Sequence, residues 1–292
     1  KLPKKLRRHW DIMKFKLSFI SQENLYNHVA ETISHYGDTL KSIDLDELNK
    51  NIVDPVKLIF DKSVYNLSWP EVISNEIHRQ RDKHNNNAIG YFHQNIFKYI
   101  KNCEVPPEVW DVIYHSPKPI NYGGHLCKDI FVEMKNKHNT MNSSASSKTF
   151  MRMQNKVYNH DRNNLNAPIS ACFLVEAIAK KSQNIPWSVT VDKEKICDER
   201  IRRVSLDQFY ALVTGEEDAF FELCCQLPNI ITDIMTHNTV FTIPKDTAFE
   251  ELVAVKERIK LRKKLSDEEL AMILAIYFLG FNDYFGFKKI SH

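Results

Sequence analysis

The chain has 292 residues, of which 43% are hydrophobic and 11% aromatic, so it can bury a full core and an intrinsically disordered chain is excluded. Its 40 basic and 37 acidic residues leave a formal net charge of +3, which does not by itself indicate a nucleic-acid partner. The six cysteines show no Cys-x-x-Cys spacing. No conventional zinc site or disulfide framework is therefore predicted, and we expect reduced thiols in a cytoplasmic protein.

Neither a secretory signal nor a membrane span is predicted. Residues 1–8 are basic, but the apolar stretch that a secretory signal needs does not follow them. Met13 opens an ordinary-looking start, so we expect residues 1–12 to be an extension or a disordered tail. The longest apolar run, over 270–281, is shorter than the roughly 20 residues that cross a bilayer.

The first hundred residues carry the start and stop signals of helices. Start signals recur at Ser21, at Asp54-Pro55 and at the capping box over 68–71. Gly37 predicts the end of the first helix, and three asparagines over 85–87 predict a polar break. Apolar residues then recur at helical spacing over 88–100. We expect a helical N-terminal part over 13–105.

From Val109 the hydrophobic period changes to that of strands. Short β-branched and aromatic runs occupy 109–114, 129–135, 169–177 and 187–191. A helix is predicted over 148–159, and helix signals resume at the capping boxes over 205–208 and 266–269.

This order of elements predicts an α/β (α+β) fold class with a small mixed sheet flanked by helices. We place the core over 106–215 and a helical C-terminal part over 216–292. Residues 13–292 are expected to form one compact domain.

The strand over 129–135 carries a pair of charged residues on one face. Strand alternation puts Ile130, Val132 and Met134 on one side, and Glu133 and Lys135 on the other with Asp129 and Phe131. Glu133 and Lys135 then lie about 6.6 Å apart along the strand. The carboxylate could hold a cation while the ammonium reaches a water or phosphate beside it. The pair suits phosphodiester hydrolysis.

A metal site needs a second carboxylate, and Asp129 lies roughly 13 Å from Glu133 along an extended strand, too far to share one ion. Asp111, in the preceding strand, is the better candidate. The loop over 115–128 contains two prolines and two glycines, and it could join the two strands as an antiparallel hairpin. Facing Cβ atoms would then approach to about 5 Å.

A Glu-x-Lys pair on a strand also occurs as an exposed ion pair without catalytic function. The surrounding segment favours the catalytic interpretation, because residues 115–138 hold four lysines and three histidines against two acids. Such a surface suits a polyanion, and the phosphate backbone of DNA is the expected substrate.

The pattern of Asp111 followed by Glu133-x-Lys135 resembles the signature of the PD-(D/E)xK nuclease superfamily, with Trp110 in place of the motif's proline. Longer runs resemble a family of type II restriction endonucleases that cut at GGNCC. These runs are 88–94, 131–144, 174–184 and 209–215. The resemblance covers most of residues 20–240.

The resemblance implies a metal-dependent endonuclease acting on double-stranded DNA. Asp111 and Glu133 would bind Mg2+, or Mn2+ as a substitute, together with the backbone carbonyl of Met134, while Lys135 positions the attacking water. The helix before the hairpin has no glutamate. Glu76, one helix earlier, is a candidate for a third ligand and alternatively a structural ion pair.

The resemblance also implies a bacterial cytoplasmic enzyme with a small mixed sheet as its nuclease core. A cognate DNA methyltransferase would be its functional partner in the same restriction–modification system. Because a GGNCC site reads the same on both strands apart from its centre, we expect a homodimer, at least on DNA.

Polar residues after the predicted strands are candidates for DNA contacts. They are Lys137, Asn139, Asn142, Ser143, Lys180, Lys181, Asn184 and Arg203. The alternative interpretation is a helix-capping turn for the asparagines and serine, and a solvated surface for the charged residues.

Two other functions compete with this prediction. One is a repair or recombination nuclease of the same superfamily that recognises DNA structure, and the other is a non-catalytic DNA-binding protein. Cleavage of a plasmid into discrete bands would exclude the first, and magnesium-dependent nicking would exclude the second.

Overall fold

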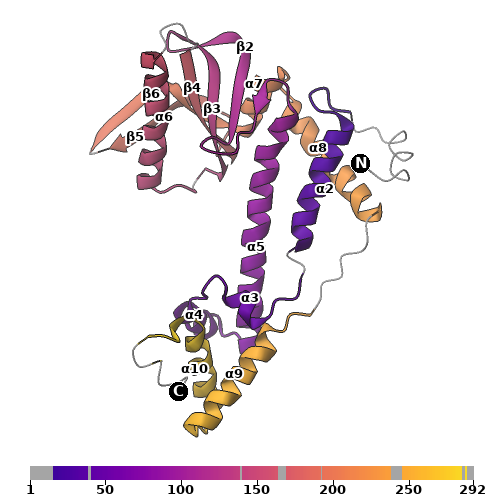
Figure 1. The fold of residues 1–292 in the computed structure, drawn as a ribbon, viewed down its shortest axis with the longest axis vertical. Helices are drawn as coiled ribbons and strands as arrows, with labels where there is room; N and C mark the ends of the chain where they lie inside the picture. The colour runs from indigo at the N-terminus through magenta and orange to yellow at the C-terminus, as the bar shows by residue number, and fades with distance from the viewer. Residues whose placement is uncertain are drawn as a thin grey trace. The chain divides into compact units, whose positions relative to one another are not determined.

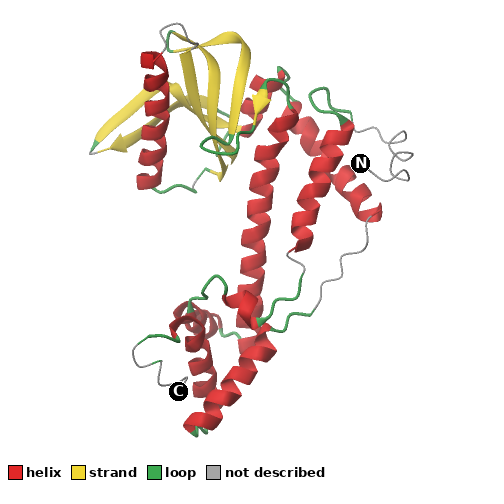
Figure 2. Cartoon of the chain, in the orientation of Figure 1, coloured by secondary structure: helices red, strands yellow, loops and turns green. Residues whose placement is uncertain are grey.

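Helices occupy both ends of the chain and strands its middle in a computed structural model (Figure 2). The structure describes residues 16–38, 41–138, 140–163, 169–191, 193–237, 245–284 and 287. The N-terminal helices are α2 (Gln22–Asp38), α3 (Leu45–Asn49), α4 (Pro55–Tyr65), α5 (Trp69–Asn95) and the 3-10 helix η1 (Ile96–Tyr99). The predicted tail over 1–12 lies outside the described residues.

The strands form one sheet in the order β1-β2-β3-β4-β6-β5. They are β1 (Cys103–Glu104), β2 (Val112–Tyr122), β3 (His125–Lys137), β4 (Ile169–Ile178), β5 (Asn184–Val191) and β6 (Glu194–Ser205). Neighbours β3 and β4, and β4 and β6, are parallel, while the other pairs are antiparallel. The predicted mixed sheet flanked by helices is therefore confirmed.

Helices cover both faces of this sheet. The remaining helices are α6 (Ser143–Asn163), α7 (Leu206–Thr214), α8 (Ala219–His237), α9 (Ala248–Lys263) and α10 (Glu268–Phe281). Helix α6 links β3 to β4 and runs across one face (Figure 1), where Phe150, Met153 and Val157 are buried. Side chains of α2, α5, α7 and α8 pack on the other face, in the largest hydrophobic core.

The hairpin of β2 and β3 is tighter than predicted. The strands continue through most of the loop expected over 115–128, and only Gly123 and Gly124 connect them. Both glycines have positive φ, +59° and +86°, as a two-residue hairpin turn requires. The pairing register shifts between His115 and Ile120. Pro117 and Pro119 lie in this interval, and they have no N–H for the ladder.

Two helices differ from the expectation. Helix α5 continues through residues 85–87, so the predicted polar break is wrong. Asparagine costs a helix well under about 1 kcal/mol per residue, and Asn86 Nδ2 also donates to Asp82 Oδ2 at 2.9 Å, one turn earlier. Helix α6 begins before the predicted residue 148, because Asn142 Oδ1 accepts from the Ala145 N–H at 2.8 Å and caps it at Ser143.

Strand β6 was not predicted, although it lies at the centre of the C-terminal half of the sheet. Charged residues stand in runs along it and do not alternate singly with apolar ones, so the segment lacks the period-2 signal of a strand and resembles an exposed segment when read alone. Two of its members, Ile201 and Val204, are fully buried. The predicted starts of α5 and α7, at Ser68 and Ser205, are confirmed, while α10 is capped by Asp267, one residue after the predicted Ser266.

Contacts divide the chain into two compact units, each assembled from separate segments. The sheet unit comprises residues 1–33 and 87–239, and the helical unit comprises residues 34–86 and 240–292. Helix α5 contributes residues to both. The predicted boundaries at 105 and 215, and the single compact domain, stay predictions.

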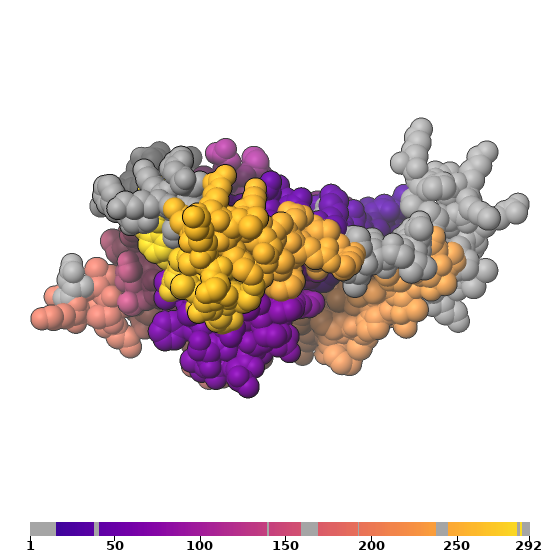
Figure 3. All heavy atoms as spheres, turned by 90° about the horizontal axis from the view of Figure 1, so that it is seen from below, coloured from indigo at the N-terminus to yellow at the C-terminus, as the bar shows by residue number. Residues whose placement is uncertain are grey.

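In the helical unit, residues from both ends of the chain share one core that includes Leu48, Leu58, Leu252 and Ile276. The gold spheres of α9 and α10 lie against the purple spheres of N-terminal helices in Figure 3. The apolar run over 270–281 is part of α10 and contributes to this core. Among the described residues, no helix combines the length and apolar character needed to cross a membrane.

Candidate active site

The hairpin places Asp111 beside the segment of β3 that carries Glu133. Val112 pairs with Val132 in the antiparallel ladder, and the Asp111 N–H donates to the carbonyl oxygen of Val132 at 3.0 Å. The Met134 N–H donates in turn to Asp111 Oδ2 at 2.7 Å. The predicted approach of these two acids is present in the structure, because pairing across a hairpin joins residues that are distant in sequence.

The alternation of β3 follows the predicted pattern, but both faces are covered. Ile130 and Val132 are buried in the core that α2 and α5 share with the sheet. Phe131, on the other face, packs with Trp110 against α6. Glu133 and Lys135 therefore lie on the face of the sheet that α6 covers. Both side chains are partly buried there and do not lie on a fully solvated face.

Two cations hold the carboxylate of Glu133, whose side chain is 14% exposed. Lys135 Nζ lies 2.7 Å from Oε1, and Arg152 of α6 forms an ion pair with Oε2. The guanidinium carbon of Arg152 also lies 4.8 Å from the ring centroid of Trp110. Sequence reasoning missed Arg152, because no local pattern distinguishes it from the other polar residues of its helix. Its contact with Glu133 depends on the packing of α6 on the sheet.

The carboxyl group of Asp111 lies in an unfavourable environment for a negative charge. Burial raises its pKa, and the nearby charge of Glu133 raises it further. The hydrogen bond from the Met134 N–H and the charges of Lys135 and Arg152 act in the opposite direction without cancelling the shift. A bound cation would relieve this repulsion between two carboxylates.

A pocket of about 440 Å³ opens beside the two acids. Asp111, Glu133, Met134 and Lys135 form one wall, and residues of α5 form another, including Gly90, Tyr91, His93 and Gln94. The helix approaches β3 closely here, since a Cβ on Gly90 would lie 3.2 Å from the amide of Asn136.

His93 brings a neutral imidazole to this pocket. Burial lowers the pKa of His93 to about 4, and His28 adds to the effect. Its Nδ1 atom is buried and has no hydrogen-bond partner among the residues that the structure describes.

The donor atoms of this wall fit magnesium. Asp111, Glu133 and the carbonyl of Met134 offer oxygen ligands, which Mg2+ prefers. Within the described ranges, no three His, Cys, Asp or Glu side chains are grouped to hold a metal ion. A magnesium site commonly uses one or two carboxylates and completes its shell with water and substrate phosphate.

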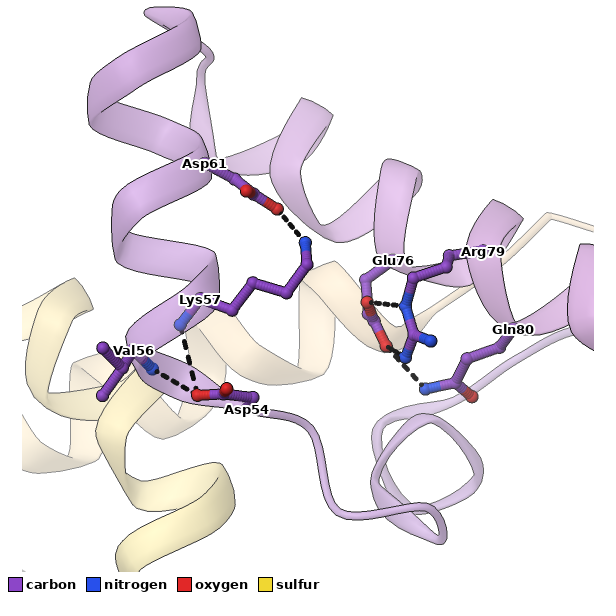
Figure 4. Close-up of polar contacts among 7 residues, drawn as sticks. All are labelled: Asp54, Val56, Lys57, Asp61, Glu76, Arg79 and Gln80. Atoms are coloured by element: carbon purple, nitrogen blue, oxygen red, sulfur yellow. Dashed lines mark hydrogen bonds and ion pairs between the residues drawn. The ribbon is translucent and has the colours of Figure 1, made fainter. Parts of the chain in front are cut away.

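Glu76 is held in an ion pair in the helical unit (Figure 4). It is only 4% exposed; Arg79 Nε donates to its Oε2 at 2.7 Å, and Gln80 Nε2 donates to Oε1 at 3.1 Å. Burial by itself raises the pKa of Glu76, but the hydrogen bonds and charge of Arg79 and Gln80 outweigh it and lower the pKa. These contacts agree with the structural alternative.

The candidates for DNA contacts fall into two groups. Lys137, Lys180 and Lys181 are exposed, whereas the remaining described candidates make contacts within the protein. Asn142 caps α6, where Ser143 is the first residue. Asn184 Oδ1 accepts from Arg202 Nε at 2.6 Å, and Arg203 forms an ion pair with the buried Glu176. Asn139 lies outside the described residues.

Comparisons with known proteins agree on one family. The sequence model of the Eco47II restriction endonuclease family matches residues 17–236. The type II restriction enzyme Sau96I of Staphylococcus aureus is 31% identical over 228 residues, which cover 74% of this chain and 80% of that enzyme. The type II restriction enzyme Eco47II of Escherichia coli is 26% identical over 247 residues, covering 80% of this chain and 95% of that enzyme.

The family match includes β2, β3 and α6, and thus the hairpin with its two acids and its lysine. Because it spans well over half of the chain, the chain belongs to the Eco47II restriction endonuclease family and is a type II restriction endonuclease, an enzyme that hydrolyses DNA at specific sites.

Proposed function

We propose that Asp111, Glu133 and Lys135 form the catalytic centre of this enzyme, and that magnesium is its cofactor. The observation that supports this most directly is that Asp111 is hydrogen-bonded to the β3 residues on either side of Glu133, Val132 and Met134. Lys135 Nζ in turn donates to Glu133 Oε1 at 2.7 Å. In this proposal Asp111, Glu133 and the carbonyl of Met134 bind the cation, and Mn2+ can replace Mg2+. Glu76 stabilises the helical unit through Arg79.

A divalent cation supplies positive charge beside the scissile phosphate and makes water a stronger nucleophile. Each residue has a distinct part in this arrangement. Asp111 lines the pocket and is oriented by the Met134 N–H, which donates to Oδ2, so Oδ1 is left for the cation. Lys135 orients the attacking water and stabilises charge on the phosphate.

We further propose that the recognition site is of the GGNCC type, since the runs at 88–94, 131–144, 174–184 and 209–215 resemble enzymes with that specificity. The exposed Lys137, Lys180 and Lys181 are suited to phosphate contacts. A cognate methyltransferase that modifies the same site is the expected functional partner.

The test of the catalytic centre is a set of single substitutions, Asp111→Ala, Glu133→Ala and Lys135→Ala. Each should lower the cleavage rate by at least about 100-fold, as loss of one charge-stabilising group does, while the protein stays folded and binds its site. Mg2+ and Mn2+ should support cleavage of a plasmid into discrete bands, and Ca2+ should support binding alone. Full activity in a chelator, or normal cleavage by Asp111→Ala, would contradict the proposal.

A further inference from the structure

Arg152 joins the proposed centre from a different element than the three residues of the motif. It lies on α6, and its side chain is 42% exposed. It contacts Glu133 Oε2, the oxygen that Lys135 does not bind. The Glu133 carboxylate thus has one cation on each oxygen, one supplied by its own strand and one by the helix above.

Trp110 holds the guanidinium in place. The ring is 8% exposed and packs against Phe131 with 5.6 Å between the ring centroids. The guanidinium carbon lies 4.8 Å from the centroid of this ring, where the electron-rich ring face attracts a cation. Trp110 stands where the superfamily motif has proline and directly precedes Asp111. The aromatic residue therefore couples the position of Arg152 to the strand that carries the first acid.

The remaining donors of Arg152 are available to a ligand. A guanidinium has five N–H donors in a planar fork. The ion pair to Glu133 uses Nη2, and the other N–H groups have no hydrogen-bond partner in the part of the chain that the structure describes. A fork of this kind matches two oxygens of one phosphate.

The charges of the centre indicate what Arg152 does during the reaction. Asp111 and Glu133 balance Lys135 and Arg152, so the four side chains are neutral together. A divalent cation bound by the two acids would leave the cluster with excess positive charge, which a DNA phosphate would offset.

Resting on the proposed function, we propose that Arg152 is a catalytic residue that binds a phosphate oxygen of the DNA. It pairs with Glu133 in the DNA-free protein and turns to the phosphate when the acids bind the cation. Trp110 keeps the guanidinium beside the centre in both states.

The competing role for Arg152 is neutralisation of Glu133 alone, and the two roles predict different measurements. An arginine that only competes with the cation would, once removed, lower the Mg2+ concentration required and leave the maximal cleavage rate intact. A phosphate-binding arginine would, once removed, lower the rate at saturating Mg2+ and weaken the salt dependence of DNA binding.

The experiment measures single-turnover cleavage at saturating enzyme and Mg2+, and DNA affinity in Ca2+ across a salt series, for Arg152→Ala and Arg152→Lys. Arg152→Ala should lower the rate by about 100-fold or more and reduce the slope of log affinity against log salt by about 0.9, the value for one phosphate. Arg152→Lys should restore most of the slope but little of the rate, because an ammonium lacks the fork. Lys148→Ala, which removes an exposed cation from the same helix, should keep the wild-type rate.

Several outcomes would overturn the proposal. One is a cleavage rate of Arg152→Ala within roughly threefold of the wild-type rate. Another is a lowered cleavage rate of Arg152→Ala with no change in the slope of log affinity against log salt. The third is an Arg152→Lys variant that cleaves as fast as the wild type. Circular dichroism and melting curves show whether each variant is folded, and the lysine variant carries the test if alanine unfolds the protein. Glu133→Ala is measured in parallel: if it cleaves normally, the catalytic centre itself is wrong, whatever Arg152 does.

Discussion

At the scale of single residues, the ionised carboxylate of Asp111 lowers the stability of the metal-free protein. The pKa of Asp111 is raised by burial and by Glu133, so its carboxyl group stays protonated to a higher pH in the folded protein than in the unfolded chain. Stability is then lost as the pH rises from the unfolded pKa through the folded pKa. At neutral pH the ionised carboxylate is less favourable than a neutral group of the same shape.

Asp111→Asn should therefore raise the melting temperature of the metal-free protein at pH 7 while abolishing cleavage. The amide oxygen can still accept from the Met134 N–H. The gain should shrink as the pH falls toward about 3.9, the ordinary pKa of aspartate, and Mg2+ should raise the melting temperature of the wild type only. Calorimetry over a pH series measures both effects, and a variant less stable than the wild type at pH 7 would refute this account.

The pKa of Glu76 is shifted in the opposite direction, so ionised Glu76 stabilises the folded protein. Its pKa is lowered by Arg79 and Gln80 against the effect of burial, so its stabilisation is present above the unfolded pKa and is lost as the pH falls through the folded pKa. Glu76→Gln should cost about 2 kcal/mol at pH 7, because hydrogen bonds to a buried charge are lost, and should leave Mg2+-dependent cleavage intact below the melting temperature.

Glu47→Gln is the matched control for Glu76→Gln. Glu47 forms an exposed pair with Lys50 in the same unit, and solvent screening leaves such pairs little effect on stability. Loss of cleavage by a folded Glu76→Gln protein, with cleavage kept by Glu47→Gln, would instead make Glu76 the third metal ligand.

At the scale of elements, the hairpin turn aligns the two strands that carry the acids. Gly123→Ala and Gly124→Ala should each cost about 1–2 kcal/mol, because both backbones are left-handed. Gly123→Ala should cost more, since its Cβ would overlap the Cβ of Glu199, whereas Gly124 has open space. Urea unfolding of the two variants tests the order, and equal midpoints would contradict the packing argument.

At the scale of the whole molecule, simultaneous cleavage of both strands requires two centres, and the proposed centre of Asp111, Glu133 and Lys135 supplies one per chain. A two-fold homodimer presents identical centres to the two halves of a GGNCC site. We expect two chains per duplex when the protein is sedimented with a short DNA carrying the site. One chain per duplex that still makes double-strand breaks in a single encounter would refute the dimer.

The sequence by itself determined the features that depend on neighbouring residues. The Asp54 and Ser68 caps could be predicted because each bonds within its own turn. The alternation of β3 could be predicted because successive side chains of a strand point to opposite faces. The hairpin followed from two adjacent strands, and its register then brought Asp111 to Glu133.

Tertiary structure decided what depends on distant segments. Arg152 reaches Glu133 only because Met153 and Val157 bury one side of α6 against the sheet. β6 is a strand because β4 and β5 pair with it on either side, which offsets the poor strand signal of its charged residues. Helix α5 continues through its three asparagines because tertiary packing outweighs their small cost in helix propensity. These contacts join residues far apart in the chain, and no local pattern records them.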